Sequence, residues 1–249
     1  MASIIAHPGR RLRLPLLALG RRLWSRVGCD CPLCGARVTG ARLCSGCAAD
    51  ITAAPPGARP RCARCALRLP VAASACPACL GAPRAYGRTI AAFDYTPPAD
   101  ALIRMLKTQL RLSMAPVLAC LLADAIRRDG GLPQGVLLAP VPASRASLRL
   151  RGMNPAAEIA RSLATQLDVP LTRQALRRLR ETPRQTGLGR RARRRVVAGL
   201  FGATPVVRGR HVALVDDVMT TGSTVQAAAT ALIAAGAAGV TVLVAARTP

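Results

Sequence analysis

The chain reads HVALVDDVMTTGST from residue 211 to residue 224, and this stretch decides the fold. Its four consecutive apolar residues, Val212 to Val215, predict a buried strand. Asp216 and Asp217 stand at the carboxyl end of that strand, and a turn of small and hydroxyl-bearing residues then opens a helix. A second apolar strand at residues 240–245 completes a strand–helix–strand unit. Because open parallel sheets bind ligands beyond the carboxyl ends of their strands, the two acids mark the expected ligand crevice.

The turn after the strand has the composition of an anion-binding site. Backbone N–H groups between Thr220 and Thr224, together with the positive end of the following helix, can cradle a terminal phosphate. Gly222 lets the backbone approach a ligand closely. The hydroxyl groups of Thr220, Thr221, Ser223 and Thr224 can donate further hydrogen bonds. The adjacent carboxylates would repel a phosphate, so we expect them to face hydroxyl donors or a metal ion. A ribose diol with a magnesium ion fits this requirement.

Helical and strand segments alternate upstream of this unit. In chain order they are a helical stretch at residues 99–109, a helix from about Pro116 to Gly130, an apolar strand at residues 136–139, and a helix that Asn154 caps and Pro155 begins. This alternation predicts an α/β domain over residues 86–249, with a mostly parallel sheet flanked by helices.

Eight of the ten cysteines form four Cys-x-x-Cys pairs, which are Cys31/Cys34, Cys44/Cys47, Cys62/Cys65 and Cys76/Cys79. A two-residue gap lets one tight turn aim two thiolates at one ion, and two such pairs complete a tetrahedral zinc site. The pattern predicts one or two structural zinc ions, held by consecutive or by interleaved pairs. Disulfide bonds are the competing interpretation, and the repeated spacing favours zinc. We therefore expect residues 29–85 to form a Cys-rich zinc-binding module, similar to a double zinc ribbon.

Residues 1–28 are expected to form a basic lead-in to that module. The apolar run from Leu14 to Leu19 is too short to span a membrane. Arg21 and Arg22 follow it where a signal peptide would have a small-residue cleavage site. The sequence therefore predicts a cytoplasmic protein without membrane insertion.

Arginine dominates the charge of the chain. Lysine and arginine number 36 against 11 acidic residues, a formal net charge of +25, and Lys107 is the only lysine. This imbalance predicts a polyanionic partner or substrate and salt-sensitive binding. A protein that is merely basic, without such a partner, is the alternative. A disordered chain is excluded because 51% of the residues are hydrophobic.

The segment from Val212 to Thr224 resembles the phosphoribosyl-pyrophosphate (PRPP) motif of type I phosphoribosyltransferases. Over nearly its full length the chain is similar to one branch of that family, the ComF family of competence-associated proteins. Its members join an N-terminal Cys-x-x-Cys zinc module to a type I phosphoribosyltransferase-like domain. The other stretches that carry the resemblance are Tyr95 with Lys107, Pro140-Val141-Pro142, Arg151-Gly152-Met153-Asn154 and residues 182–188, which read TPRQTGL.

The resemblance implies roles for individual residues. Asp216 and Asp217 would meet the ribose hydroxyls of PRPP, with Mg²⁺ accompanying the ligand, and residues 220–224 would hold the 5′-phosphate. Arg145, in the loop after the Pro140-Val141-Pro142 stretch, would approach the pyrophosphate. A mobile flap that covers the site would contain Gln185 and Arg190.

Three functions are compatible with these motifs. In the preferred one, the protein binds PRPP or a related phosphoribosyl ligand and acts in DNA uptake, holding single-stranded DNA, with a competence helicase as a partner. In the second, it is an active phosphoribosyltransferase that transfers the phosphoribosyl group from PRPP to an unidentified acceptor. In the third, a degenerate transferase fold serves only protein contacts. The catalytic residues, if any, are not identified by the sequence.

Overall fold

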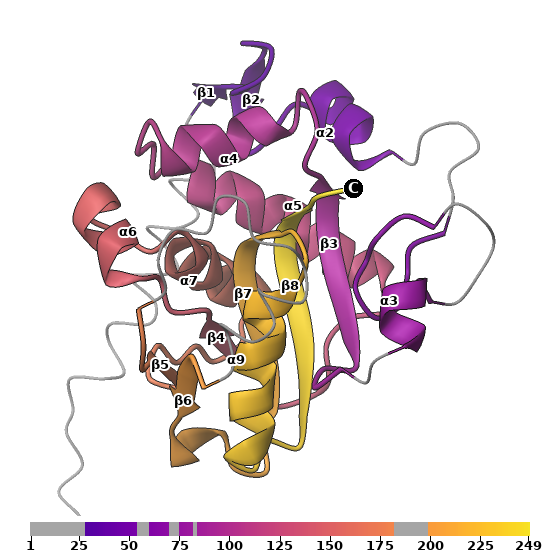
Figure 1. Ribbon diagram of the computed structural model, residues 1–249. Helices are drawn as coiled ribbons and strands as arrows, with labels where there is room; N and C mark the ends of the chain where they lie inside the picture. Colours follow the sequence, from indigo (N-terminus) through magenta and orange to yellow (C-terminus); the bar gives the residue numbers. More distant parts are fainter. Residues whose placement is uncertain (1–27, 54–59, 70–74, 82–83, 182–198) are drawn as a thin grey trace, which may run out of the picture.

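A four-stranded parallel sheet is the centre of the structure, a computed structural model that describes residues 28–53, 60–69, 75–81, 84–181 and 199–249 (Figure 1). Its strand order is β3-β8-β7-β4. The strands are β3 (Arg88–Asp94), β4 (Leu137–Pro140), β7 (His211–Met219) and β8 (Gly239–Arg247). The predicted parallel α/β sheet is confirmed, although the sequence pattern indicated no strand at residues 88–94, where β3 lies.

The two central strands are apolar because helices cover both of their faces. Val212 pairs with Val240 and Val215 with Leu243, and all four side chains are almost completely buried. The pairing with β8 continues beyond the apolar run, since Asp216 lies opposite Val244. The acids therefore lie within β7, where the ladder of hydrogen bonds fixes their backbone.

Two layers of helix enclose the sheet (Figure 1). On one face lie α4 (Asp100–Lys107), α5 (Met114–Arg128) and α7 (Pro155–Leu167), and the other face carries α9 (Ser223–Ala234). The predicted start of α7 is confirmed, because the Asn154 side chain accepts a hydrogen bond from the N–H of Ala156 at 3.1 Å and Pro155 is the first helical residue. The connecting helix α6 (Arg145–Arg151) follows β4.

Short elements complete the described chain. They are β1 (Gly28–Asp30), β2 (Arg37–Thr39), α2 (Ser45–Thr52), α3 (Pro77–Leu80), β5 (Leu176–Arg178), β6 (Phe201–Ala203) and η2 (Pro205–Val207). None of the helices described is both long and apolar enough to cross a membrane.

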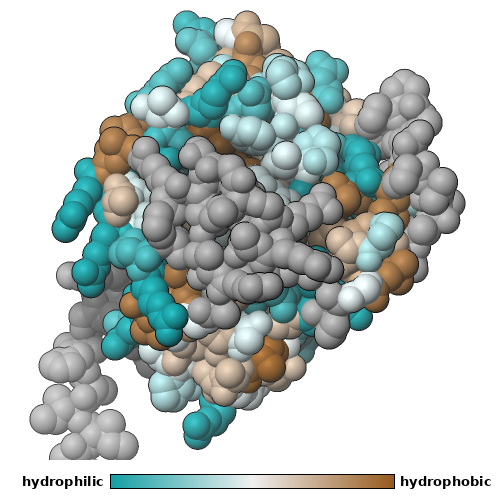
Figure 2. Space-filling view, in the orientation of Figure 1, coloured by the Kyte–Doolittle hydropathy of each residue, from teal (hydrophilic) through white to brown (hydrophobic). Residues whose placement is uncertain are grey.

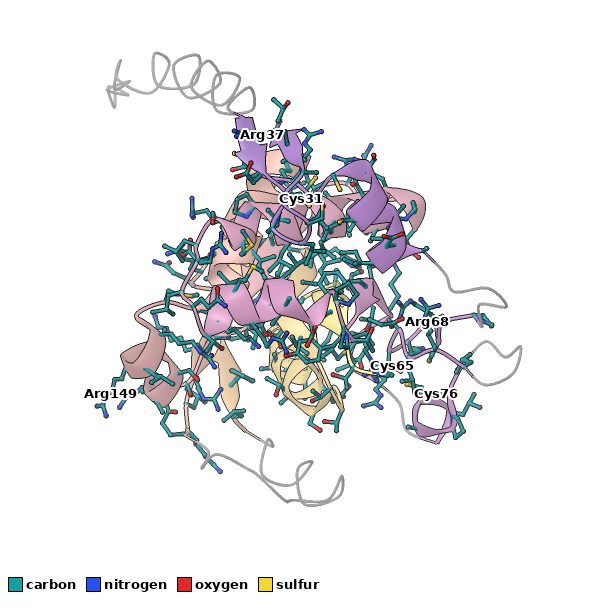
Figure 3. All side chains as sticks on the ribbon, turned by 90° about the horizontal axis from the view of Figure 1, so that it is seen from above. Cys31, Arg37, Cys65, Arg68, Cys76 and Arg149 are labelled. Atoms are coloured by element: carbon teal, nitrogen blue, oxygen red, sulfur yellow. The ribbon has the colours of Figure 1, made fainter. Side chains whose placement is uncertain are left out.

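The cysteines pack against opposite faces of the sheet. Cys31 and Leu43 join the hydrophobic cluster under α4, α5 and α7. Cys62, Cys65 and Cys76 join the cluster under α9. Figure 3 shows the same separation, with Cys31 on one side of the molecule and Cys65 beside Cys76 on another. Residues of the N-terminal segment thus share both cores of the α/β domain.

The helix layer makes a prediction about stability. Leu118 of α5 is fully buried, whereas Leu150 of α6 is 63% exposed. Leu118→Ala should lower the free energy of unfolding by about 2–5 kcal/mol, because it leaves a cavity in the core. Leu150→Ala should change it by less than about 0.5 kcal/mol. Urea unfolding measures both, and equal effects would contradict this packing.

Candidate functional site

A cleft of about 150 Å³ opens at the carboxyl ends of β4 and β7. We call it the ribose cleft, after the ligand that the resemblance implies. Its walls come from the end of α4, the loop after β4, helix α6, the start of α7 and the acidic end of β7. The lining residues are Lys107, Val141, Pro142, Ala143, Ser147, Arg151, Asn154, Pro155, Ala156, Asp216, Asp217 and Thr224. The structure therefore brings the predicted acids to the sheet edge where α/β proteins bind their ligands.

The two acids of β7 share one cation. The Lys107 ammonium lies 2.6 Å from Oδ2 of Asp217, and both side chains are largely buried. The Asp217 N–H donates to Oδ1 of Asp216 at 2.9 Å, which holds the neighbouring carboxylate beside it. Burial, and then the negative charge of Asp217, raise the pKa of Asp216 well above its usual range. The ribose cleft thus contains a pair of carboxyl groups with one lysine beside them, and hydroxyl donors or a cation would stabilise the second negative charge.

Lys107 had no role in the sequence interpretation, although it belongs to the stretches that carry the family resemblance. Lys107 is the last residue of α4. Because α4 packs against α5, the ammonium of Lys107 reaches Asp217 of β7. One signal was present in the sequence: this is the single lysine in a chain with 36 basic residues.

The turn that follows β7, residues 220–224, leads into the first turn of α9, and we call it the phosphate loop after the role that the resemblance implies. Gly222 has a φ of 75° and is the N-cap of α9. A side chain at this position would be strained by that φ and would place its Cβ 2.5 Å from the end of the Met219 side chain. The N–H groups of Thr220, Thr221 and Gly222 have no acceptor among the described residues. These open donors lie at the positive end of α9, where a phosphate is favoured.

The loop after β4 is fixed by an amide. The Asn154 side chain donates from Nδ2 to the carbonyl of Val141 at 2.9 Å, which ties this loop to the start of α7. Ser147 and Arg151 of α6 reach the ribose cleft from the same side. Arg145, the predicted pyrophosphate residue, is the exposed first residue of α6 and is not among the described lining residues. Gln185 and Arg190 lie outside the described residues.

The cysteines form two groups of four, each built from consecutive pairs. The first cysteine group is Cys31, Cys34, Cys44 and Cys47, and the second cysteine group is Cys62, Cys65, Cys76 and Cys79. The sulfurs of each group lie within 4.8 Å of one another. Two contacts, Cys34 to Cys44 and Cys65 to Cys76, measure 3.6 Å. Four sulfurs around one zinc ion lie about 3.8 Å apart, so both groups fit a tetrahedral metal ion.

The first cysteine of each group has a lowered pKa, which favours its thiolate form. Burial opposes ionisation of Cys31, but backbone N–H groups, first that of Cys44, lower its pKa to about 6. Burial likewise opposes ionisation of Cys62, but the N–H groups of Cys76 and of its own turn lower its pKa to about 7. Cys31 and Cys62 therefore favour the thiolate, which is the form in which cysteine binds metal ions.

Asp216 makes stability depend on pH. Because its pKa is raised in the folded protein, the folded state keeps a proton that the unfolded chain loses above about pH 4. This contribution to the free energy of unfolding is present at low pH and falls as pH rises toward the folded pKa. Asp216→Asn keeps the shape without the charge, so thermal unfolding should show a variant more stable than wild type at pH 8 and a smaller difference at pH 5. Equal stability at pH 8 would contradict the buried charge.

Comparisons with known proteins agree with this geometry. Residues 152–249 match the phosphoribosyl transferase domain family. The DNA utilization protein YhgH of Salmonella typhi is 37% identical over 191 residues, which cover 75% of this chain and 84% of that protein. Its counterpart in Escherichia coli (strain K12) is 34% identical over 190 residues, with 75% and 84% covered.

A relative from another genus has a competence name. Competence protein F of Haemophilus influenzae is 32% identical over 190 residues, which cover 73% of this chain and 80% of that protein. The aligned part of each relative is most of its length, and the parallel sheet flanked by helices is the fold that the resemblance implied. The chain therefore belongs to the ComF family of competence-associated proteins and carries a type I phosphoribosyltransferase-like domain.

Proposed function

We propose that this protein binds PRPP, or another compound with a phosphoribosyl group, in the ribose cleft and the adjoining phosphate loop. One observation carries the proposal: two carboxyl groups, with a single lysine beside them, lie next to a loop whose N–H donors have no acceptor among the described residues. Such a site attracts hydroxyl donors at one end and a phosphate at the other. A pentose 5-phosphate carries both kinds of group.

Each part of PRPP would contact a different set of residues in the cleft and the loop. The 2- and 3-hydroxyls of ribose would donate to Asp216 and Asp217, which relieves the repulsion between these acids. The 5-phosphate would accept from the N–H groups of the phosphate loop. A pyrophosphate on C1 would lie toward Ser147 and Arg151 of α6, and Arg145, Gln185 and Arg190 are the proposed residues that close over it.

A magnesium ion fits the donor set of the cleft. Magnesium in proteins is held by one or two carboxylates together with substrate phosphates, and Asp216 and Asp217 supply the carboxylates. When bound, Mg²⁺ would neutralise pyrophosphate charge. We also propose that both cysteine groups hold structural zinc ions, because each offers four sulfur ligands and thus fills a tetrahedral site.

The relatives point to a role in the use of DNA. Two of them are named DNA utilization proteins and one is named a competence protein. We propose that this protein acts in DNA uptake or in the handling of single-stranded DNA, in the cytoplasm and alongside a competence helicase. The alternative is an active phosphoribosyltransferase of nucleotide metabolism. Release of pyrophosphate from PRPP in the presence of candidate acceptors separates these two functions.

A basic helix beside the ribose cleft is the proposed contact for DNA. Exposed Arg145 and Arg149 lie on α6, whose last residue Arg151 lines the cleft. Arg149 stands at the outer edge of the molecule in Figure 3. Figure 2 shows hydrophilic side chains together with a hydrophobic group on the edge that α6 occupies, and Leu148 and Leu150 of this helix are exposed. Guanidinium groups placed in this way suit phosphates of a nucleic-acid backbone.

Calorimetry with PRPP and Mg²⁺ tests the ligand proposal. The wild-type protein should bind PRPP, and the variant with both Asp216→Asn and Asp217→Asn should bind at least about tenfold more weakly, since charge-assisted hydrogen bonds to the ribose are lost. Asp124→Asn is the matched control, because Asp124 pairs with Arg127 on the outer surface of α5. Wild-type protein that releases no heat with PRPP, or a double variant that binds like the control, would contradict the proposal.

Salt dependence tests the DNA contact. Binding of a fluorescent single-stranded oligonucleotide should weaken steeply between roughly 50 and 200 mM salt. Arg149→Ala should lower the slope of log affinity against log salt by about 1. Arg161→Ala is the control, because Arg161 is also exposed but pairs with Glu158 at 2.8 Å. A salt-independent affinity would exclude backbone electrostatics as the mode of binding.

A further inference from the structure

Arg247, the last residue of β8, is a buried cation outside the ribose cleft. Only 6% of it is exposed. A buried guanidinium is stable only when acceptors satisfy its donors. Among the described residues, the acceptors of Arg247 are backbone carbonyls and not a carboxylate. Its hydrogen bonds therefore connect separate segments of the chain.

The segments that Arg247 joins are the second cysteine group and the base of the phosphate loop. Its Nε donates to the carbonyl of Cys65 at 2.9 Å, and its Nη1 donates to the carbonyl of Met219 at 3.1 Å. Nη1 also donates to the carbonyl of Thr248. Met219 is the residue immediately before the phosphate loop, and its carbonyl accepts a second bond from the N–H of Thr248 at 3.0 Å.

Further contacts connect the same two parts. A cavity of about 340 Å³ is lined by Cys65 and Cys76 of the second cysteine group and by Thr220, Thr221 and Ser223 of the phosphate loop. Arg84, Arg247 and Thr248 also line it. The N–H of Ala85, in the segment that leaves the second cysteine group, donates to the Gln226 side chain in the first turn of α9 at 3.2 Å.

The first cysteine group lacks these connections. It packs in the opposite core, under α4 and α5. Within the described residues no hydrogen bond joins it to residues 219–224. The molecule therefore contains two groups of the same chemistry, of which one is tied to the phosphate loop.

We propose that the second cysteine group, acting through Arg247 as a positioning residue, holds the phosphate loop in its anion-binding shape. This inference rests on the proposed phosphoribosyl function. A metal ion fixes the turn that presents the Cys65 carbonyl, because metal binding and local folding are coupled in small cysteine sites. Without the metal ion the Cys65 carbonyl is no longer held in place and Arg247 loses an acceptor. The guanidinium is then less well fixed, and the Met219 carbonyl at the base of the loop keeps only its bond from the N–H of Thr248.

Hydrogen exchange and calorimetry on the full-length protein test the coupling together. Cys79→Ser removes a ligand of the second group and Cys34→Ser removes one of the first, and metal analysis should find one zinc ion fewer in each. The amides of Thr248 and Gln226, which donate to the carbonyls of Met219 and Gly222 at the two ends of the loop, should exchange at least tenfold faster in Cys79→Ser, a change that we call faster loop exchange. The dissociation constant for PRPP should rise at least tenfold. In Cys34→Ser both values should stay within about threefold of wild type.

Arg247→Met keeps the test decisive if Cys79→Ser does not fold. This variant removes the guanidinium donors and leaves both cysteine groups intact. Loop exchange and the dissociation constant for PRPP should therefore rise as in Cys79→Ser, while the zinc content stays at that of wild type. Arg88→Met is its control, because Arg88 ties β3 to Asp129 and Gly131 far from the loop.

The outcomes separate the two proposals. Loop exchange in Arg247→Met that equals that of Arg88→Met would overturn the coupling, whether or not PRPP binds. Faster loop exchange in a protein whose wild type does not bind PRPP would support the coupling and contradict the phosphoribosyl function.

Discussion

The other elements are arranged around two neighbouring carboxyl groups of one strand that are largely shielded from water. β7 must be buried to form the centre of the sheet, so Asp216 and Asp217 at its end are partly removed from water. One ammonium, that of Lys107, compensates them. A fold selected for stability alone would avoid this arrangement, and its presence at the carboxyl edge of a parallel sheet is best explained by a ligand.

The surrounding elements serve to keep this edge in shape. α4 delivers its last residue to the acids, and the amide of Asn154 fixes the loop on the other wall. The phosphate loop leaves its N–H groups open because Gly222 adopts a backbone conformation that other residues avoid. Arg247 donates to the carbonyl of Met219, the residue just before this loop. The cysteine groups occupy opposite faces of the sheet and so brace the domain from two sides.

Local features of the sequence were sufficient for part of this picture. The strand and turn at residues 211–224 and the cap at Asn154 depend on neighbours within a few residues, and both were predicted correctly. The approach of Lys107 to Asp217 joins residues 110 positions apart in the chain, and that of Arg247 to Cys65 joins residues 182 apart. Such pairs follow from tertiary packing, which no local pattern encodes. The pairing of the cysteines was undecided for the same reason.

A crystal structure of the protein with ribose 5-phosphate and Mg²⁺ tests the central claim most directly. The account predicts that the phosphate lies on the N–H groups of residues 220–224, that the ribose hydroxyls contact Asp216 and Asp217, and that the Lys107 ammonium is drawn away from Asp217. The sugar phosphate bound elsewhere, with the loop amides turned away and the ion pair unchanged, would contradict it.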